Sequence, residues 1–231
     1  MVAALGASGN LTVGERLVLV GAGGFGRETA ELVRAINAAQ RGAPAWELLG
    51  FLDDDDALWG ASLSGTRVLG GLDALADLPD VRLAVCTGHP GNFASKQRIV
   101  GRLGLARERY ATLVHPAAVV AGSCSLGEGT VVHAGVVATA DVAVGAHAGV
   151  MPHAVFTHDD RLDDYVTVGA GARLAGAVHV GAGAYLGAGC MIRESCTVGP
   201  GALVAMGAVV TRDVPGGEVW AGVPARFVRA V

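Results

Sequence analysis

The chain has 231 residues, a formal net charge of −4 and no run of basic residues, so neither a nucleic acid nor an anionic membrane is an expected partner. Hydrophobic residues make up 52% of the sequence but aromatic residues only 5%, which indicates a core of Val, Leu and Ala. No apolar run is long enough to span a bilayer, and the N-terminus lacks the basic segment of a signal peptide. We therefore expect a cytoplasmic protein without a membrane partner.

The N-terminal part of the chain begins with a segment, residues 1–14, that is expected to form a loose leader because its residues are small and polar. Residues 16–20 form a short apolar run typical of a buried parallel strand. A glycine-rich turn follows at Gly21–Gly26, and residues 27–36 have a helical pattern. Strand, glycine turn and helix in this order predict a turn whose backbone N–H groups bind phosphate.

Two more buried strands are expected at 46–52 and 82–86, with a short strand edge and helix at 68–75 and a helix at 93–105. Three strand–helix units predict a small parallel sheet with its ligand at the carboxyl ends of the strands. We assign residues 15–112 to this Rossmann-like domain. The glycine pattern alone does not identify NAD as the ligand.

An acidic run, Asp53–Asp56, follows the second expected strand. An acid in that place can bind ribose hydroxyls. We expect most of the run, from Asp54 onward, to be a solvated turn.

A repeat of six residues organises the rest of the chain. Counted in sixes from Val114, every first position holds a bulky apolar residue except Ala138, and every fifth position is small or β-branched except Asp160. Seventeen units run to Val214 without an insertion. Because so short a unit cannot bury its own apolar side chains, copies must stack. The pattern predicts a triangular solenoid in which residue i lies over residue i+18.

This solenoid is assigned to residues 113–231, with the segment 219–226 capping the last coil or folding back along the prism. Three of the four cysteines, Cys124, Cys190 and Cys196, occupy inward fifth positions. Their spacing fits neither a zinc site nor a disulfide framework, so core packing in a reducing compartment is the expected role.

Asp160 breaks the repeat, and such breaks are candidates for function. His158 lies two residues earlier, near a corner of the expected prism, with the small residues Ala140 and Gly176 one coil away on either side. Asp159 and Asp160 adjoin it, and a carboxylate on one ring nitrogen raises the basicity of the other. The sequence therefore predicts a general base at His158, against the plainer alternative of a surface histidine in a polar corner.

Taken together, these features resemble the sugar O- and N-acyltransferases of the sialic acid O-acetyltransferase type, which include nucleotide-amino-sugar N-acetyltransferases of bacterial glycan synthesis. The resemblance covers residues 16–231 and is carried by the segments 17–27, 49–54 and 221–225 and by Thr157-His-Asp159 within the hexapeptide run. It implies an α/β N-terminal Rossmann-like domain followed by an all-β left-handed parallel β-helix. It also implies a homotrimer with each active site between two prisms.

The resemblance assigns roles to individual residues. Those that match the nucleotide-sugar site are Gly23, Gly24, Phe25, Asp53 and Asp54. Those that match the catalytic pair are His158, the base, and Asp159, the acid that supports it. Those that match the acetyl-CoA groove are Thr167, Gly176, Ala188 and Met206. The family often has histidine where this chain has Phe25 and Thr167.

The expected reaction is direct transfer of an acetyl group from acetyl-CoA to an amino or hydroxyl group of a sugar, which we expect to be nucleotide-linked. No Cys or Ser stands beside His158 as a covalent nucleophile.

One alternative is a γ-type carbonic anhydrase-like zinc protein, since His153 and His158 have the spacing of its paired ligands, although Ala117 occupies the place of the third. A second is a non-catalytic nucleotide-sugar-binding scaffold. A dinucleotide oxidoreductase would leave half of the chain unexplained, and the sequence does not name the acceptor sugar.

Overall fold

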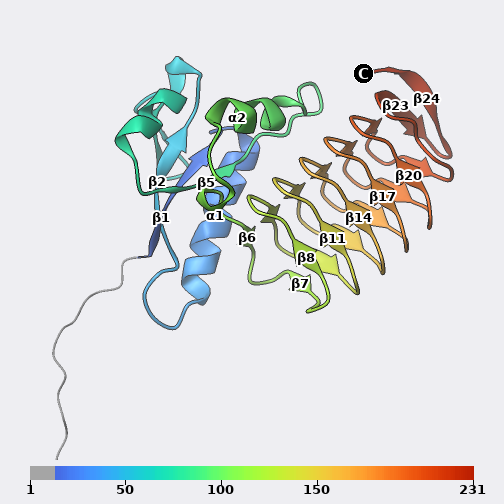
Figure 1. Cartoon of the computed structure of the whole chain (residues 1–231), viewed down its shortest axis with the longest axis horizontal. Helices are drawn as coiled ribbons and strands as arrows, with labels where there is room; N and C mark the ends of the chain where they lie inside the picture. Colours follow the sequence, from blue (N-terminus) through green and yellow to red (C-terminus); the bar gives the residue numbers. More distant parts are fainter. Residues whose placement is uncertain (1–13) are drawn as a thin grey trace, which may run out of the picture.

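The structure, a computed structural model, describes residues 14–231, so all but the last residue of the expected leader lies outside the described residues. An α/β domain adjoins a long triangular prism of stacked coils (Figure 1). Both parts of the predicted fold, the Rossmann-like domain and the parallel β-helix, are confirmed.

The N-terminal domain is a five-stranded sheet in the order β3-β4-β2-β1-β5, parallel except for the β3–β4 pair. Its elements are β1 (Glu15–Val20), α1 (Gly24–Ala39), β2 (Trp46–Leu52), β3 (Ser62–Leu63), β4 (Thr66–Gly70), β5 (Arg82–Val85) and α2 (Ser95–Leu103), with 3-10 turns at Asp56–Leu58, Leu72–Asp77 and Arg107–Arg109. No helix within residues 14–231 is long and apolar enough to cross a membrane.

Strand β1 is apolar because both faces of this sheet are covered. Leu17 and Leu19 pack with α1 on one side, while Val18 and Val20 pack on the other side, where α2 lies. All four side chains are buried. The carboxyl ends of β1, β2 and β5 consequently meet at one edge of a rigid sheet.

The prism consists of two-residue strands that pair in parallel with the strands eighteen residues before and after them, as Val137 does with Val119 and Val155. Face 1 contains β6 (Leu113–Val114), β9 (Val131–Val132), β12 (Gly149–Val150), β15 (Thr167–Val168), β18 (Tyr185–Leu186) and β21 (Leu203–Val204). Face 2 contains β7 (Val119–Val120), β10 (Val137–Ala138), β13 (Val155–Phe156), β16 (Arg173–Leu174), β19 (Met191–Ile192) and β22 (Val209–Val210). Face 3 contains β8 (Ser125–Leu126), β11 (Ala143–Val144), β14 (Arg161–Leu162), β17 (His179–Val180) and β20 (Thr197–Val198).

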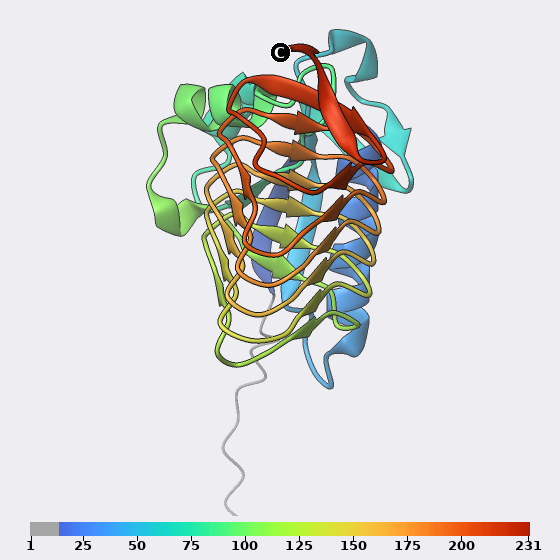
Figure 2. The same ribbon diagram turned by 90° about the vertical axis from the view of Figure 1, so that its right-hand side faces the viewer.

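Three corners join these faces in the order in which the chain turns. The first corner lies between faces 1 and 2, the second between faces 2 and 3, and the third between faces 3 and 1. In the view turned by 90°, the coils follow one another as a stack of similar turns (Figure 2). From Val132 onward the second residue of every strand is buried, and so is every fifth position of the repeat, as the sequence predicts. Cys190 and Cys196 are among these buried residues, and all four cysteines are unpaired.

The C-terminal segment continues face 1 and then folds back. Strand β23 (Glu218–Gly222) pairs in parallel with β21, and β24 (Ala225–Ala230) returns antiparallel to it. Trp220 is buried at the end of the prism core.

The N-terminal domain lies against face 1. The outward residues Val131, Gly149 and Thr167 of that face are buried, and the Phe93 ring of the N-terminal domain lies 5.9 Å from the ring of Tyr185. The other two faces carry no such cover within residues 14–231.

Candidate active site

The glycine turn after β1 forms one wall of a cavity of about 560 Å³ at the carboxyl end of the sheet. Gly21 has a φ of +102°, and a side chain at Gly26 would collide with the Gly21 carbonyl oxygen, so both positions require glycine. Side chains at Gly23 or Gly24 would meet nothing within 4 Å. These two glycines therefore open the start of α1 to a ligand in the cavity.

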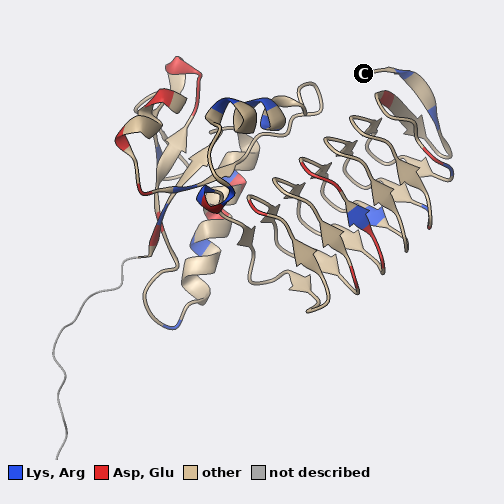
Figure 3. Cartoon of the chain, viewed as in Figure 1, with Lys and Arg blue, Asp and Glu red and all other residues tan. Residues whose placement is uncertain are grey.

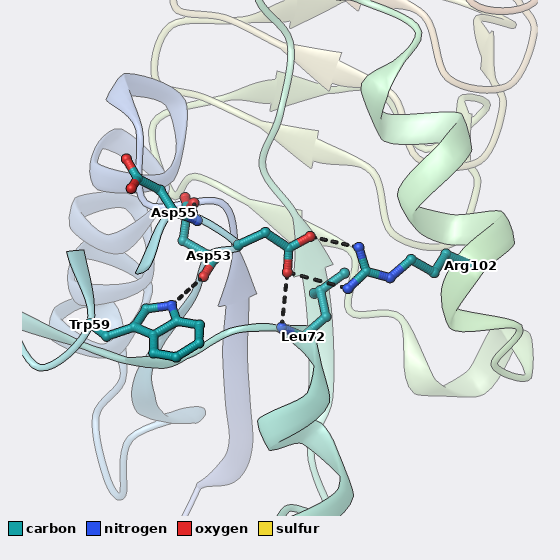
Figure 4. A network of polar contacts seen from close by, with 6 residues as sticks. Asp53, Asp55, Trp59, Leu72 and Arg102 are labelled. Carbon is teal, nitrogen blue, oxygen red and sulfur yellow. Dashed lines mark hydrogen bonds and ion pairs between the residues drawn. The ribbon is translucent and has the colours of Figure 1, made fainter. Parts of the chain in front are cut away.

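The carboxylates of the acidic run after β2 have different partners (Figure 4). Asp53 lines the cavity and accepts a hydrogen bond of 2.8 Å from the backbone N–H of Ala22, which joins β2 to the glycine turn. Asp54 lines an adjoining hollow but turns towards α2, where it pairs with Arg102 at 2.6 Å. The hydrogen bond from Arg102 is the main reason that the pKa of Asp54 is lowered. Asp55 caps a 3-10 turn through the N–H of Ala57, as expected of a solvated turn.

Phe25 connects this cavity to the prism. Its ring lies 5.7 Å from the ring of His133 and 5.4 Å from the ammonium nitrogen of Lys96. Lys96 is only 1% exposed, and burial lowers its pKa to about 8. No ion pair within residues 14–231 involves this ammonium group. No signal in the sequence indicates a buried lysine, because a lone Lys among polar residues of a short helix is typical of a solvated surface.

His158 and Asp159 form a pair at the second corner of the prism. The ring nitrogen Nδ1 lies 2.8 Å from Asp159 Oδ2, and Asp159 has a φ of +64° that turns its carboxylate outwards. The ring lies against Gly176, one coil further on, where any side chain would collide with it. Nε2 is therefore the ring nitrogen left for a substrate. The predicted contact between His158 and a carboxylate is made by Asp159.

Asp160 points the other way, into the prism. Its side chain is buried and accepts two hydrogen bonds of 2.9 Å, from the backbone N–H groups of Thr157 and Val178. Burial raises its pKa to about 6. The break in the repeat that drew attention to this segment is thus explained by backbone hydrogen bonding inside the coil, and not by contact with His158.

The four residues that match the coenzyme groove lie in three places. Gly176 adjoins His158 at the second corner, whereas Ala188 and Met206 follow face 1 at the first corner. Thr167 lies on face 1 beneath Gly88, and its buried hydroxyl has no hydrogen-bond partner among the described residues. The full width of face 2 separates Gly176 from Ala188 and Met206, so one prism does not bring the four together.

The described residues contain no group of three or more His, Cys, Asp or Glu side chains arranged to hold a metal ion. His153 lies at the first corner, and His158 lies at the second. The spacing that suggested paired zinc ligands therefore places these two histidines at different edges of face 2.

An α/β domain with a glycine-turn cavity, joined to a hexapeptide prism that carries a histidine–carboxylate pair, defines the class of hexapeptide-repeat acyltransferases. Residues 16–103 match the family model "PglD N-terminal domain", and residues 177–212 match "Bacterial transferase hexapeptide (six repeats)". A perosamine N-acetyltransferase from Caulobacter crescentus, solved with CoA and GDP-perosamine, is 32% identical with a TM-score of 0.79, over 92% of this chain and 96% of that one.

Two further relatives of this chain are also N-acetyltransferases or acetyltransferase domains. The acetyltransferase domain of PglB from Neisseria gonorrhoeae, solved with acetyl coenzyme A, is 30% identical with a TM-score of 0.80, over 93% of this chain and 100% of that domain. The UDP-N-acetylbacillosamine N-acetyltransferase of Bacillus subtilis is 32% identical over 124 residues, which are 52% of each chain, so the match spans about half the length of this curated relative. The chain belongs to the nucleotide-amino-sugar N-acetyltransferase family. A zinc enzyme is not favoured by these relatives.

Proposed function

We propose that this protein transfers the acetyl group of acetyl-CoA to the amino group of a nucleotide-linked sugar. The observation that carries the proposal is the His158–Asp159 pair, with Nδ1 held at 2.8 Å and Nε2 free, on a corner of the hexapeptide prism. The relatives solved with CoA or acetyl coenzyme A support the donor, and those named for perosamine and N-acetylbacillosamine support an amine acceptor over a hydroxyl.

His158 acts as the general base. Asp159 fixes the tautomer in which Nδ1 carries the proton, so Nε2 takes a proton from the amine as its nitrogen attacks the thioester carbonyl carbon. The new C–N bond forms, the C–S bond breaks, and His158 returns the proton to the departing thiolate. General-base assistance of this kind contributes roughly 10²- to 10⁴-fold. The acetyl group passes directly from acetyl-CoA to the amine. Because all four cysteines are unpaired, we assign the reaction to the reducing cytoplasm.

The glycine-turn cavity holds the nucleotide. The N–H groups at Gly23 and Gly24, at the start of α1, suit the diphosphate. The α1 N-cap residue is Gly23, which has no side chain that could occupy these donors. Asp53, at the carboxyl end of β2, accepts from the ribose hydroxyls, and Phe25 and Asp54 border the remainder of the ligand.

The active assembly is a homotrimer built on face 2. The outward residues of this face are apolar apart from Arg173: Val119 is 63% exposed, Met191 is 46% exposed, and Val137, Val155 and Val209 are half-buried. An apolar stripe of this length is a typical subunit interface. If the first corner of one prism meets the second corner of the next, the contact is head-to-tail and closes into a ring. The family resemblance supplies the number three.

This arrangement completes the site. In one chain the side chains of His158 and Asp159 are 67% and 62% exposed, whereas electrostatic catalysis needs water to be excluded. A neighbouring first corner, carrying Ala188 and Met206, would cover the pair and bring together the coenzyme residues that face 2 separates. Met206, which is 77% exposed in one chain, would then be buried against the partner.

The reaction is tested by following thiol release from acetyl-CoA with a panel of nucleotide-linked amino sugars and matched hydroxyl sugars. We expect turnover with an amino sugar, and His158→Ala is expected to lower kcat by roughly 10²-fold or more. Turnover with hydroxyl acceptors alone would move the activity to O-acetylation. Full kcat in His158→Ala would remove the general-base assignment.

The shared site is tested by subunit complementation. Gly24→Trp is expected to fill the nucleotide cavity without a clash, because the space above Gly24 is open. Co-expressed Gly24→Trp and His158→Ala chains should recover about one quarter of wild-type activity, since in a randomly mixed ring a quarter of the sites pair an intact cavity with an intact base. No recovery in mixed trimers would place the cavity and base of each site in one chain.

A further inference from the structure

A second cavity, of about 590 Å³, lies outside the site described above, between the N-terminal domain and the third corner of the prism. Its size falls within the range of small-molecule sites. It is lined on one side by Asn92, Phe93 and Arg98 and on the other by Tyr165, Gly183 and Gly201. Neither Asp53 nor His158 reaches it, and the proposed acetyl transfer makes no use of it.

The cavity exists because the residues stacked at one position of the third corner change from large side chains to glycine along the prism. The fourth position of each unit at the third corner has a left-handed backbone, which favours glycine. Glycine occupies this position at Gly129, Gly183 and Gly201. His147 and Tyr165 have the same left-handed backbone, with φ of +55° and +64°, although they carry large side chains. Two rings thus stand in a column in which the following two coils have no side chain.

These two rings are stacked. Their centroids are 5.2 Å apart and their planes differ by 5°. Tyr110 closes the far end of the stack with an edge contact of 4.5 Å to His147. The other face of Tyr165 is directed to the next coil, where side chains at Gly183 or Gly201 would meet nothing within 4 Å. The stack therefore ends in an open flat surface inside the cavity.

Among the residues that the structure describes, Arg98 has the one charged side chain in the lining, which also includes Val231, the residue that carries the terminal carboxylate. Arg98 contributes a guanidinium group that hydrogen-bonds to the Asn92 side chain, and no Asp or Glu lines the cavity. Lys and Arg gather on α2, from which Arg98 projects (Figure 3). A ligand that fits has a planar ring to continue the stack and an anionic group for Arg98.

We propose that this cavity binds a nucleoside phosphate, with its base stacked on Tyr165 and its phosphate on Arg98. Asn92 lines this cavity and also the glycine-turn cavity, so occupancy here bears on the loop that borders the sugar nucleotide. The nucleotide is either free or carried within coenzyme A, and the chemistry that recognises it is the same.

The test is isothermal titration calorimetry on the full chain carrying Gly24→Trp, which blocks the glycine-turn cavity. ADP and UDP represent free nucleotides, coenzyme A the carried form, and ribose 5-phosphate the ligand without a base. ADP or UDP is expected to bind, and ribose 5-phosphate is not. Tyr165→Gly should weaken binding ~5- to 150-fold, the range that base stacking on an aromatic ring covers.

Tyr165→Gly suits this test because glycine is the residue that the next two coils have at this left-handed position. Tyr165→Phe, which keeps the ring, should bind as the parent does, and Arg98→Gln should weaken the binding of ADP and UDP. Binding of coenzyme A that Tyr165→Gly weakens, without binding of ADP or UDP, would identify the carried nucleotide as the ligand. Absence of binding in the Gly24→Trp chain, or binding that Tyr165→Gly leaves unchanged, would overturn the proposal.

Discussion

Gly176 determines where the His158 imidazole lies, and Gly176→Ala tests this directly. A methyl group there would come within 3.0 Å of Nδ1 and closer still to Cε1 and Nε2. The ring must therefore move by about 1 Å to regain ordinary contact, and a displacement of that size at a reacting group costs on the order of 10²-fold in rate. We expect kcat to fall by about that factor. The melting temperature should change little, because the displaced ring is largely exposed.

The assay is acetyl-CoA turnover with kcat and KM determined separately. Gly122→Ala is the matched control, because Gly122 occupies the same column three coils earlier and a methyl group there meets nothing within 4 Å. If Gly176 served only the coenzyme, KM for acetyl-CoA would rise at unchanged kcat. A Gly176→Ala enzyme with wild-type kcat would refute the argument that this glycine positions His158.

Three further predictions concern stability, assembly and substrate. The folded-state pKa of Asp160 is raised to about 6, so the wild-type free energy of unfolding should fall as pH rises from about 4 to about 6. Asp160→Asn keeps only one acceptor oxygen, so it should lose this pH dependence and lower the free energy of unfolding by ~1–3 kcal/mol. Both effects are measured by denaturant titration. Met191→Glu on face 2 should yield monomers in analytical ultracentrifugation, whereas Thr197→Glu at the matching position of face 3 should not; intact trimers in both would exclude face 2. Asp53→Ala should raise KM for the nucleotide sugar but not for acetyl-CoA, and an unchanged KM would remove the ribose contact.

The prism was predictable because its information is local and repeated. The same positions point inwards in every coil. Asp160 occupies a fifth position, and fifth positions point inwards, so its burial could be predicted from the repeat. The same counting separates His158 from Ala188. Thirty residues are five units, and since three units return the chain to the same corner, these residues fall at different corners.

The environment of Lys96 was not predictable. Its burial depends on the packing of α2 against Gly149 of face 1, where a side chain in place of the glycine hydrogen would come within 3.1 Å of the ammonium nitrogen. Contacts between two domains that fold from separate patterns leave no periodic trace in either pattern. The same applies to the cavity beside Tyr165, which exists only because the loop at Asn92 reaches the third corner.

Phe25 and Thr167, the two positions at which the family resemblance leads us to expect histidine, lie close together in the structure. A side chain at Gly88 would come within 3.3 Å of the Thr167 hydroxyl and 4.0 Å of the Phe25 ring, so both line the same junction of the two domains. The Lys96 ammonium nitrogen lies 5.4 Å from the centroid of the Phe25 ring. One imidazole restored alone, by Thr167→His, would therefore be placed near an apolar ring and a buried ammonium group, a setting that disfavours its charged form. Both side chains border this junction, and the Thr167 hydroxyl there has no hydrogen-bond partner among the described residues.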